Sequence, residues 1–457
     1  MATRRKRRQA RRVLLQALSS WQWQDRTADL PLTIRWLDSE GSLNNADRDF
    51  FVSALNTITQ VPSKWDAVFE RFLDRDISAL DGVELAVLRA GSFELYQHRE
   101  IATSIVINEW IELTKQFGAT DSFKYINGVL HNVAESVRSE PLGEFELIDV
   151  ILEELRDCIS HPMISVETGD DAGVIQIPEG QDLVVTTDVL QEGTHFPKGT
   201  RPDLIGYRAM AANFSDLAAM CAIPYFTTIA LTIDNSDPAW LRGFAQGVAL
   251  ASKEFGSVVL GGNLNKGLLS ISVTAHGLVP FGQAISRDGA VVGDDLWLTG
   301  KIGATSAFLE SADPLPDLPI FQLRQRRSES ASLSYFMPRP RVEIASRLRH
   351  IAHSAIDISD GLLSDLNHLA QKSGCGARIQ IEDVPVWSEA PLPAAYGADD
   401  SYELLFTAPT YARATIQAVS EEVGTPVSRI GHMVEGSEVQ VTKDGKSIDL
   451  PQGYRHF

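Results

Sequence analysis

The spacing of apolar residues changes once along this chain, near residue 143, and that change limits the folds open to it. Before it, apolar residues recur every three or four positions, which is typical of amphipathic helices. The expected helical segments are 13–21, 46–58, 83–96, 102–117 and 121–137. Asp121 is a candidate N-cap for the last of them. The stretch SEPLGEF (139–145) breaks the pattern with Pro141 and Gly143. We therefore predict an all-α domain over 1–138 and a linker at 139–142.

Beyond the linker, short β-rich runs alternate with longer helical segments. The expected strands are 182–190, 225–233, 257–262, 295–300, 354–359 and 402–408. The expected helices are 202–222, 238–255 and 360–374. Residues 312–335 are rich in Pro, Ser and Arg, and we expect a loop or an irregular insert there. This order of elements predicts an α/β or α+β body of the kind found in enzymes.

Charge is distributed unevenly over the 457 residues. Residues 1–140 hold 18 Lys and Arg against 19 Asp and Glu, so they carry −1 of the total net charge of −19 and the rest carries −18. Seven of the first twelve residues are Arg or Lys. The asymmetry predicts two modules with different partners.

Three cysteines, Cys158, Cys221 and Cys375, lie far apart without C-x-x-C spacing. This argues against a disulfide framework and a zinc site, and it predicts a reducing, cytoplasmic compartment. No apolar run approaches the roughly 18 residues of a membrane helix, so we expect no membrane partner. The basic start is followed by a short apolar stretch that contains Gln16, which does not fit a signal peptide.

Residues 261–267 read GGNLNKG and lie between two apolar runs. A glycine pair after a buried strand lets the backbone approach a phosphate, so Gly262 is a candidate ATP contact. A carboxylate at the next position would hold a metal ion against that phosphate. This chain has Asn263 there, which offers a carbonyl oxygen but no charge.

Carboxylates gather at the predicted ends of elements in the second module. Taken singly, each aspartate reads as an N-cap or turn residue, but packed together without cations they would repel one another. Hard oxygen donors without nearby His or Cys suit Mg²⁺, and Mg²⁺ in turn suggests a polyphosphate substrate. The candidates are Asp170, Asp171, Asp188, Asp216, Asp357 and Asp360, together with Thr186 and Thr187, which precede Asp188 at a strand end.

A Walker A phosphate loop is not present. Gly445, Lys446 and Ser447 are in sequence, but Gln440 stands where the motif needs its first glycine. KDGKS (443–447) is instead predicted to form a hairpin turn. ATP would then be held by scattered glycines, metals and a cation, for which Arg287 is the candidate; an exposed loop arginine is the plainer interpretation.

The second module resembles the thiamine-monophosphate kinase (ThiL) family, of the aminoimidazole-ribotide-synthetase-like (PurM-like) superfamily. The motifs that carry the resemblance are GEFELI (143–148), GDDAGV (169–174), TTDVLQEGTHF (186–196), NFSDLAAM (213–220), SISVTAHGLVP (270–280), IDISDGLLSDL (356–366), GCGARI (374–379), YELLFT (402–407) and GYRHF (453–457). The resemblance implies two α+β domains, 143–290 and 291–457.

The resemblance also implies phosphorylation of thiamine monophosphate by ATP, with several Mg²⁺ ions and a homodimer. By position, the family's metal ligands match Asp171, Thr186, Thr187, Asp188, Asp216, Asn263, Asp357 and Asp360. Its ATP contacts match Gly262, Asn263, Arg287 and Ser359, and its substrate contacts match His195, Asp400 and Tyr454. No acid or base residue is implied, because a phosphate monoester is largely dianionic at neutral pH.

The chain departs from the family pattern at two places. The family has GGDTTRG where this chain has GGNLNKG, so a carboxylate becomes Asn263 and an arginine becomes Lys266. The family has GG-acid-Asp-Tyr-Glu-Leu where this chain has ADDSYEL (398–404). One charge pair at ~4 Å in an effective dielectric of ~20 contributes a few kcal/mol of attraction. Much of the attraction lost with the carboxylate is offset, because the remaining carboxylates repel one another less. We predict an active kinase with a raised magnesium requirement; a weakened or silent kinase is the alternative.

The first module resembles the NusB family of transcription antitermination factors. The resemblance rests on RRKRRQARRVLLQALSSWQ (4–22), VELAVLRAGSFEL (83–95) and INEWIELTKQFGATDSFKYINGVL (107–130). It implies binding of a short single-stranded boxA element in RNA together with a ribosomal-protein partner. Arg7, Arg8 and Arg11 are placed to track RNA phosphates, and Asp121 and Tyr125 match residues near the RNA and partner surface.

Taken together, these features predict a bifunctional fusion of an RNA-binding antitermination module and a vitamin-cofactor kinase. Two other readings stay open. In one, the protein is a kinase whose helical module serves solubility or assembly. In the other, it is an RNA-binding protein whose kinase body is weakened or inactive because of Asn263.

Overall fold

The computed structural model describes residues 2–23, 30–99, 101–139, 143–234, 237–311, 315–391, 396–448 and 450. The predicted substrate residue Tyr454 and the linker residues 140–142 lie outside these ranges. The chain divides into two compact units. The first comprises Met1–Glu153 with Ser236–Ala239, and the second comprises Glu154–Asn235 with Trp240–Phe457.

The described part of the first unit is helical, as the sequence predicts. Its helices are α1 (Ala2–Trp23), α2 (Leu30–Ser39), α3 (Arg48–Gln60), α4 (Pro62–Glu70), α5 (Gly82–Gln97), α6 (Thr103–Phe117), α7 (Ser122–Ser139) and α8 (Glu144–Leu155), of which α8 crosses the boundary between the units. The five expected segments correspond to α1, α3, α5, α6 and α7, whereas α2, α4 and α8 were not predicted.

Side-chain caps fix where several of these helices begin. Asp81 starts α5 with a capping box, in which its carboxylate accepts the Glu84 N–H and the Glu84 carboxylate accepts the Asp81 N–H. Asp47 caps α3 by accepting the Phe50 N–H at 3.2 Å. Asp121 does precede α7, but its φ is +68° and its carboxylate lies 2.9 Å from Lys124 Nζ.

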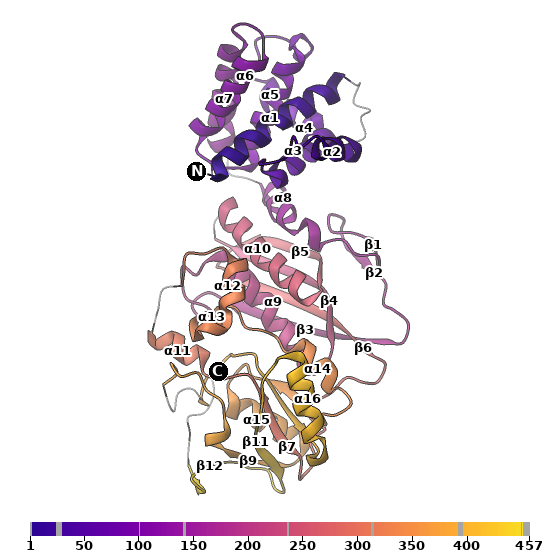
Figure 1. The fold of residues 1–457 in the computed structure, drawn as a ribbon, viewed down its shortest axis with the longest axis vertical. Helices are drawn as coiled ribbons and strands as arrows, with labels where there is room; N and C mark the ends of the chain where they lie inside the picture. Colours follow the sequence, from indigo (N-terminus) through magenta and orange to yellow (C-terminus); the bar gives the residue numbers. More distant parts are fainter. Residues whose placement is uncertain are drawn as a thin grey trace. The chain divides into compact units, whose positions relative to one another are not determined.

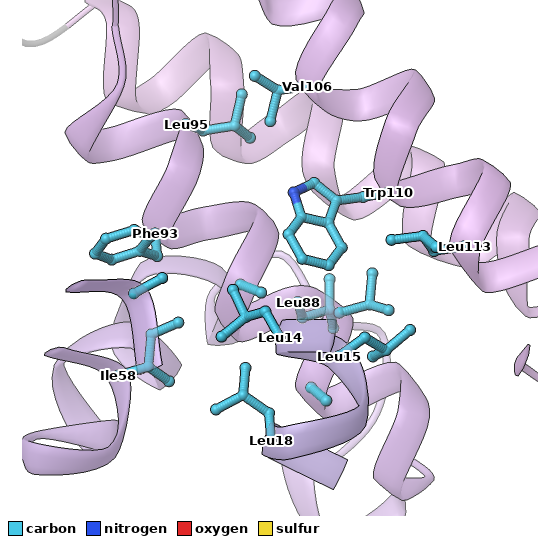
Figure 2. Close-up of a cluster of buried hydrophobic side chains, with 14 of the residues drawn as sticks. Leu14, Leu15, Leu18, Ile58, Leu88, Phe93, Leu95, Val106, Trp110 and Leu113 are labelled. Carbon is cyan, nitrogen blue, oxygen red and sulfur yellow. The ribbon is translucent and has the colours of Figure 1, made fainter. Parts of the chain in front are cut away.

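The core of the first unit surrounds α5 and α6. Figure 2 shows the Trp110 indole of α6 among Leu14, Leu15 and Leu88, with Phe93 of α5 nearby. These side chains are buried. Burying one such side chain fully contributes about 1.5–3 kcal/mol, so the helices hold one another rather than standing alone.

The second unit contains three sheets. A two-stranded sheet pairs β1 (Ile164–Val166) with β2 (Val174–Ile175). A four-stranded sheet has the order β3 (Gln181–Gln191), β6 (Ser270–Pro280), β4 (Ile223–Ile233), β5 (Val258–Lys266). A seven-stranded sheet has the order β13 (Lys446–Ser447), β12 (Val439–Lys443), β9 (Gly376–Gln380), β11 (Val427–Val434), β7 (Asp295–Thr299), β10 (Leu404–Ala408), β8 (Ser354–Asp357). Most pairs are antiparallel, which makes the body α+β.

The helices of the second unit are α9 (Pro202–Ala219), α10 (Pro238–Phe255), α11 (Ala304–Ser311), α12 (Ile320–Arg326), α13 (Ala331–Phe336), α14 (Val342–Leu348), α15 (Leu362–Ser373) and α16 (Arg413–Val423). The three expected helices correspond to α9, α10 and α15. The expected loop or partly irregular insert over 312–335 contains two short helices, α12 and α13, which were not predicted. Leu323 and Phe336 are buried in these helices, so apolar residues between the polar ones anchor them.

Helix α9 contacts strands of both the four-stranded and the seven-stranded sheet. It packs against β3 and β6 (Figure 1) and also approaches β8 and β10. On its other side it meets α10 very closely. A Cβ on Gly206 would lie 2.2 Å from the Phe244 carbonyl oxygen, and one on Gly247 would lie 1.9 Å from the Asp203 carbonyl oxygen. Only glycine permits this approach, which fixes where the N-terminal half of α9 lies against α10.

The GGNLNKG stretch forms part of a strand rather than a loop. We expected a strand over 257–262, but β5 continues to Lys266. A Cβ on Gly262 would lie 2.2 Å from the Ile229 carbonyl oxygen of β4. Gly262 is therefore required by the contact between two strands, whatever else its backbone approaches. The expected hairpin at KDGKS is confirmed, since β12 and β13 pair antiparallel around Asp444 and Gly445.

Candidate active site

Two predicted ligands meet where β3 faces α9. Thr186 Oγ1 donates to Asp216 Oδ2 at 2.6 Å. The Asp188 N–H, two residues along the same strand, donates to Asn213 Oδ1 of α9 at 3.1 Å. Because side chains alternate along a strand, Thr186 and Asp188 share the face that α9 covers.

Thr187 points to the opposite face of β3. It is exposed, and its Oγ1 donates to the Val273 carbonyl oxygen at 3.2 Å and accepts from Thr274 Oγ1 at 3.1 Å. Three consecutive side chains on one strand cannot reach one site, so the expectation of three adjacent oxygen ligands needs correction. The side chains of Thr186 and Asp188 lie on the α9 face and that of Thr187 does not.

The carboxylates around α9 raise one another's pKa. Burial, together with the charges of Asp216 and Asp360, raises the pKa of Asp188 to about 6. Burial and the charge of Asp216 likewise raise the pKa of Asp357, which is buried at the end of β8. Burial also raises the pKa of Asp216, while Arg287 and the Thr186 hydroxyl act in the other direction. The structure thus brings Asp188, Asp216, Asp357 and Asp360 into one electrostatic group.

An aspartate that the motif analysis did not single out shapes the turn between β8 and α15. Asp365 Oδ2 accepts the backbone N–H groups of Ser359, Asp360 and Gly361 at 3.0–3.1 Å. Burial raises the pKa of Asp365 to about 7 against the effect of these donors. Three donors on one oxygen fix the turn, so Asp365 orients Asp360 and Ser359. Its place in the first helical turn after a loop was the sequence signal.

Arg287 lines a cavity of about 360 Å³ beside this group. Thr186 and Asp216 form one part of its wall, and Lys372 of α15 forms another. Lys372 was not among the candidate site residues, and its position near the end of a predicted helix gave no sign of the cavity. The cavity lining therefore combines the carboxylates of Asp216 and Asp288 and hydroxyl oxygens with two cations, Arg287 and Lys372.

Asp171 and Asn263 lie toward the other edge of the four-stranded sheet. Asp171 is exposed in a loop that packs on β5, where Thr168 Oγ1 donates to the Val259 carbonyl oxygen at 3.1 Å. Strands β6 and β4 separate β5 from β3. At ~4.8 Å per strand the two edges are about 14 Å apart, so one ion cannot bind side chains from both edges of the same chain.

Asn263 also faces away from α9. Leu264 is in register with Leu231, and both are buried on the α9 face. Asn263, one residue earlier, is exposed on the opposite face. That face also carries Thr187, so the structure separates these two predicted ligands from Asp188 and Asp216.

The predicted substrate residues Asp400 and His195 are connected through Arg208 and Tyr335. The Arg208 guanidinium donates to the Asp400 carboxylate and to the Tyr335 carbonyl oxygen, and the Tyr335 hydroxyl donates to the His195 carbonyl oxygen at 3.1 Å. Thr305 Oγ1 donates to the other carboxylate oxygen of Asp400. The motif analysis did not point to Arg208 or Tyr335.

Tyr402 lies between the substrate residues and the acidic group. It has a φ of +56°, a left-handed conformation that costs energy for a tyrosine. Burial raises its pKa well above the usual value, with the charges of Asp400, Asp188 and Asp357 acting in the same direction and Arg208 opposing them. A strained, buried residue at this position joins the two halves of the site.

Within the described residues, no group of three or more His, Cys, Asp or Glu side chains is already gathered closely enough to hold a metal ion. The donors near α9 are nevertheless carboxylate and hydroxyl oxygens that repel one another. Mg²⁺ keeps several water ligands and commonly uses one or two carboxylates plus substrate phosphates. The donor set at Asp188, Asp216 and Asp357 therefore fits Mg²⁺ that arrives with a nucleotide.

The first unit has a basic cavity of about 490 Å³ at the start of α1. Arg5, Arg8 and Arg12 line it, together with the amides of Asn44 and Asn45. These three arginines are exposed. Guanidinium groups and amides in this arrangement offer donors to anionic oxygens.

Arg11 does not fit the RNA contact that the sequence predicted. It is only 2% exposed, and its guanidinium donates to both oxygens of the buried Glu94 at 2.6–3.2 Å. Trp110 Nε1 donates to the same carboxylate at 2.8 Å. Arg7 is half-buried, with its Nε 3.3 Å from Asp47. Helix periodicity turned Arg11 toward the core and Arg8 toward solvent.

Asp121 and Tyr125 lie near the start of α7. The Asp121 carboxylate is exposed beside Lys124. The Arg75 guanidinium stacks 4.1 Å above the Tyr125 ring centroid. Both residues are therefore near the surface, but this basic and aromatic pair was not predicted.

None of the described helices is long and apolar enough to cross a membrane. The thiols of Cys158, Cys221 and Cys375 are free and buried.

Three family models match the chain. Residues 8–135 match the NusB family. Residues 169–279 match the N-terminal domain, and residues 291–444 the C-terminal domain, of AIR synthase related proteins. The N-terminal unit thus contains a NusB domain, and the body after it has the AIR-synthase-related fold.

Curated relatives and solved structures match the second part of the chain. The thiamine-monophosphate kinase of Escherichia coli K12 is 36% identical over 330 residues, which cover 69% of this chain and 98% of the relative. That of Aquifex aeolicus is 30% identical over 340 residues, which cover 70% and 100%.

Among solved structures, thiamine-monophosphate kinase from Stenotrophomonas maltophilia K279a is 36% identical with a TM-score of 0.59, over 68% of this chain and 99% of that one. AaThiL complexed with AMPPCP and TMP is 30% identical with a TM-score of 0.51, over 69% and 97%. By identity and coverage, the chain belongs to the thiamine-monophosphate kinase family, with a NusB domain preceding the kinase body.

Proposed function

We propose that the second unit transfers the γ-phosphoryl group of ATP to thiamine monophosphate, giving thiamine diphosphate. The observation that carries this is the group of Asp188, Asp216 and Asp357 beside the cavity that Arg287 lines. A related structure holds AMPPCP and TMP, and the chain covers 97% of it.

The chemistry needs two anions brought together rather than a general base. A phosphate oxygen of the substrate attacks the γ-phosphorus, the new oxygen–phosphorus bond forms, and the bond to the β-bridging oxygen breaks to release ADP. The second pKa of a phosphate monoester is near ~6, so the nucleophile is mostly ionised at neutral pH. Arg287 and Lys372 would orient nucleotide phosphates, and no phosphoenzyme is required.

Asp188, Asp216, Asp357 and Asp360 would hold Mg²⁺, with the Thr186 hydroxyl as a further oxygen donor. Bound Mg²⁺ neutralises phosphate oxygens as the two substrates approach. Without cations, burial and repulsion from neighbouring carboxylates raise the pKa values of Asp188 and Asp357, and ion binding would relieve that repulsion.

A homodimer would complete the site from the open face of the four-stranded sheet. Leu183, Val185 and Val189 of the edge strand β3 are 40%, 55% and 51% exposed on that face. An apolar edge strand invites pairing with another strand. A second copy whose β5 lay beside β3 would bring Asn263 of the partner subunit next to Thr187, which one chain alone does not do.

The test is ATP-dependent formation of thiamine diphosphate by the full chain, followed by chromatography over a magnesium titration. We expect saturable turnover, and Asp216→Asn should lower kcat at least 100-fold. The exposed Asp383→Asn, which removes the same charge elsewhere, should keep full activity. Absence of turnover at every magnesium concentration would refute the proposal and leave RNA binding as the working function.

A second function is favoured by the basic cavity of the first unit. We propose that Arg5, Arg8 and Arg12 bind phosphates of a single-stranded, boxA-like RNA, with Asn44 and Asn45 as amide donors. Arg11 contributes through the fold rather than by RNA contact, because Glu94 occupies its guanidinium.

RNA binding can be measured by fluorescence anisotropy at several salt concentrations. Two phosphate contacts on a single strand contribute about 1.4 to the slope of log K against log salt. We therefore expect Arg8→Ala with Arg12→Ala to reduce the slope by that amount. The control pair Arg35→Ala with Arg48→Ala removes the same charge from exposed positions outside the cavity and should leave the slope unchanged. Equal losses in both pairs would indicate unspecific attraction.

The resemblance to NusB also suggests a ribosomal-protein partner and a cytoplasmic location. Asp121 and Tyr125 are our candidates for that partner surface. Calorimetric titration with the ribosomal protein, with and without RNA, would test this: we expect binding that Tyr125→Ala weakens at least tenfold. Unchanged affinity would place the partner elsewhere.

A further inference from the structure

We infer that Arg208 and Tyr335 are positioning residues that hold His195 and Asp400 in one geometry for thiamine monophosphate. The inference rests on the proposed kinase function. His195 and Asp400 are far apart in sequence and lie in different loops, so something must set their relative placement. Arg208 of α9 and Tyr335 of α13 form the link.

The first step of the link runs from Arg208 to Asp400. Arg208 is 1% exposed, and Nη2 donates to Asp400 Oδ2 while Nη1 donates to the Tyr335 carbonyl oxygen. A guanidinium presents these donors in a fixed plane, so the two acceptors are held at a set separation. Thr305 holds the second carboxylate oxygen of Asp400, which leaves that side chain one orientation.

The second step runs from Tyr335 to His195. The Tyr335 ring lies 4.1 Å from the Arg208 guanidinium carbon and stacks on Phe308 with centroids 4.7 Å apart. Phe336 meets both rings edge-on. With the ring fixed on both faces, the hydroxyl can donate only in one direction, and it donates to the His195 carbonyl oxygen at 3.1 Å.

His195 is also held from its own strand. Its Nδ1 accepts the Gln191 N–H at 3.1 Å, so the ring is oriented by β3 and the backbone by Tyr335. A displacement of α13 would therefore move His195 and Arg208 together. The network can hold substrate-binding groups without touching the phosphates, so its loss should change substrate affinity more than the chemical step.

Tyr335→Phe is the sharpest test, because it removes the hydroxyl that reaches His195 and keeps the ring on Arg208. We expect the KM for thiamine monophosphate to rise three- to tenfold, with kcat and the KM for ATP within twofold. Arg208→Lys keeps the charge but not the planar pair of donors, and it should raise the same KM more than tenfold. The double variant should fall short of the product of the two effects, because both residues act through one link.

Tyr207→Phe is the matched control. Tyr207 precedes Arg208 on α9 and is equally buried, but its hydroxyl donates to Glu254 at 3.0 Å, away from the substrate residues. It should lower Tm without changing either KM. If Tyr335→Phe and Arg208→Lys behave like this control, the network is only structural and the inference is wrong.

Calorimetric binding of thiamine monophosphate separates this inference from the proposed function. A native chain that binds and phosphorylates the substrate, with variants of unchanged affinity, would overturn the inference alone. A native chain that neither binds nor phosphorylates it would overturn both.

Discussion

Aspartates of the second unit differ in exposure and in whether their carboxylate oxygens already accept hydrogen bonds. Asp365 Oδ2 is occupied by three backbone donors, and Asp216 receives the Thr186 hydroxyl. Asp171 is exposed in a loop. Buried and mutually repelling carboxylates attract a divalent cation more strongly than an exposed one does. In the proposed kinase, the residues around α9 would therefore form the main cation site, and Asp171 would serve a second position.

Asn263→Asp should restore a carboxylate on the open face of β5. We expect the magnesium midpoint for thiamine diphosphate formation to be three- to tenfold lower. One more negative charge near a cation adds a few kcal/mol of attraction, and part of it remains after the added repulsion between carboxylates is subtracted. The measurement is turnover against magnesium at saturating ATP.

Asn265→Asp is the control for that change. Asn265 is also exposed, two residues farther along β5 on the same face. Asn265→Asp adds the same charge at a position that the family motif does not assign to the metal. Equal shifts in both variants would show a general electrostatic effect and remove Asn263 from the ligand set.

At the scale of elements, periodicity decides which residues of a motif can act together. The sequence predicted the strand β3 and the helix α1, and the structure places Thr186 and Asp188 on β3 and Arg8 on α1. The roles of these residues as ligands and RNA contacts stay predictions. It did not separate Thr187 from Asp188 or Arg11 from Arg8, although periods of 2 and 3.6 imply both. A motif does not distinguish adjacent residues, which differ in whether they lie on the buried face of the strand or helix.

The Arg11–Glu94 pair ties α1 to α5 and should be costly to break. Glu94→Ala leaves the buried Arg11 guanidinium with only a 3.8 Å contact to Glu109 and the Trp110 N–H without its acceptor, so we expect a loss of about 3–5 kcal/mol in unfolding free energy. Asp38→Ala breaks the exposed pair with Arg48 and should cost no more than about 0.5 kcal/mol.

Denaturant unfolding followed by helix content measures both losses. Glu94→Gln keeps the shape and guards against a variant that fails to fold. A loss below ~1 kcal/mol in Glu94→Gln would mean that Arg11 reaches solvent and is available to RNA after all.

His276 of β6 should make the stability of the second unit depend on pH. Its ring stacks on Phe226 at 4.1 Å, and burial lowers the pKa of His276 below the usual value near ~6.5. The unfolded chain then binds a proton that the folded one does not. The contribution of His276 to stability is fully present above pH ~6.5 and is lost as the pH decreases toward the pKa of the folded state. The loss is about 1.4 kcal/mol for each unit by which folding lowers this pKa.

The pH dependence can be checked by urea unfolding between pH 5 and 7.5. Subtracting the curve of His276→Phe, which keeps the stacking, isolates the contribution of this ring from those of the acidic group. Identical slopes in the two proteins would count against the shift.

At the scale of the whole molecule, two separate cores hold the chain together. One cluster of buried side chains runs from Ala10 to Val137, and the other clusters lie in the second unit. The change of periodicity near residue 143 predicts two modules with their boundary before α8, whereas the two compact units divide within α8. The division of α8 between the two units was not predictable, because its pattern of apolar residues is the same whichever unit it packs against. The boundary lies between Glu153 and Glu154.

Separate cores should give two unfolding transitions in calorimetry. AMPPCP with thiamine monophosphate and magnesium should raise the Tm of one transition, by an amount set by affinity, and leave the other unchanged. Single-stranded RNA should do the reverse. One transition that both ligands shift equally would show that the units unfold together and would argue for coupling between the two activities.

The order of the two cores has a consequence during protein synthesis. The helical unit is nearly complete once Glu153 has left the ribosome, and 304 residues still follow. At about 5–20 residues per second, their translation takes roughly 15–60 s. Helical domains with local contacts fold in microseconds to milliseconds. The nascent chain would therefore expose its basic cavity before the kinase body has been synthesised, and the proposed RNA binding would begin on an incomplete chain.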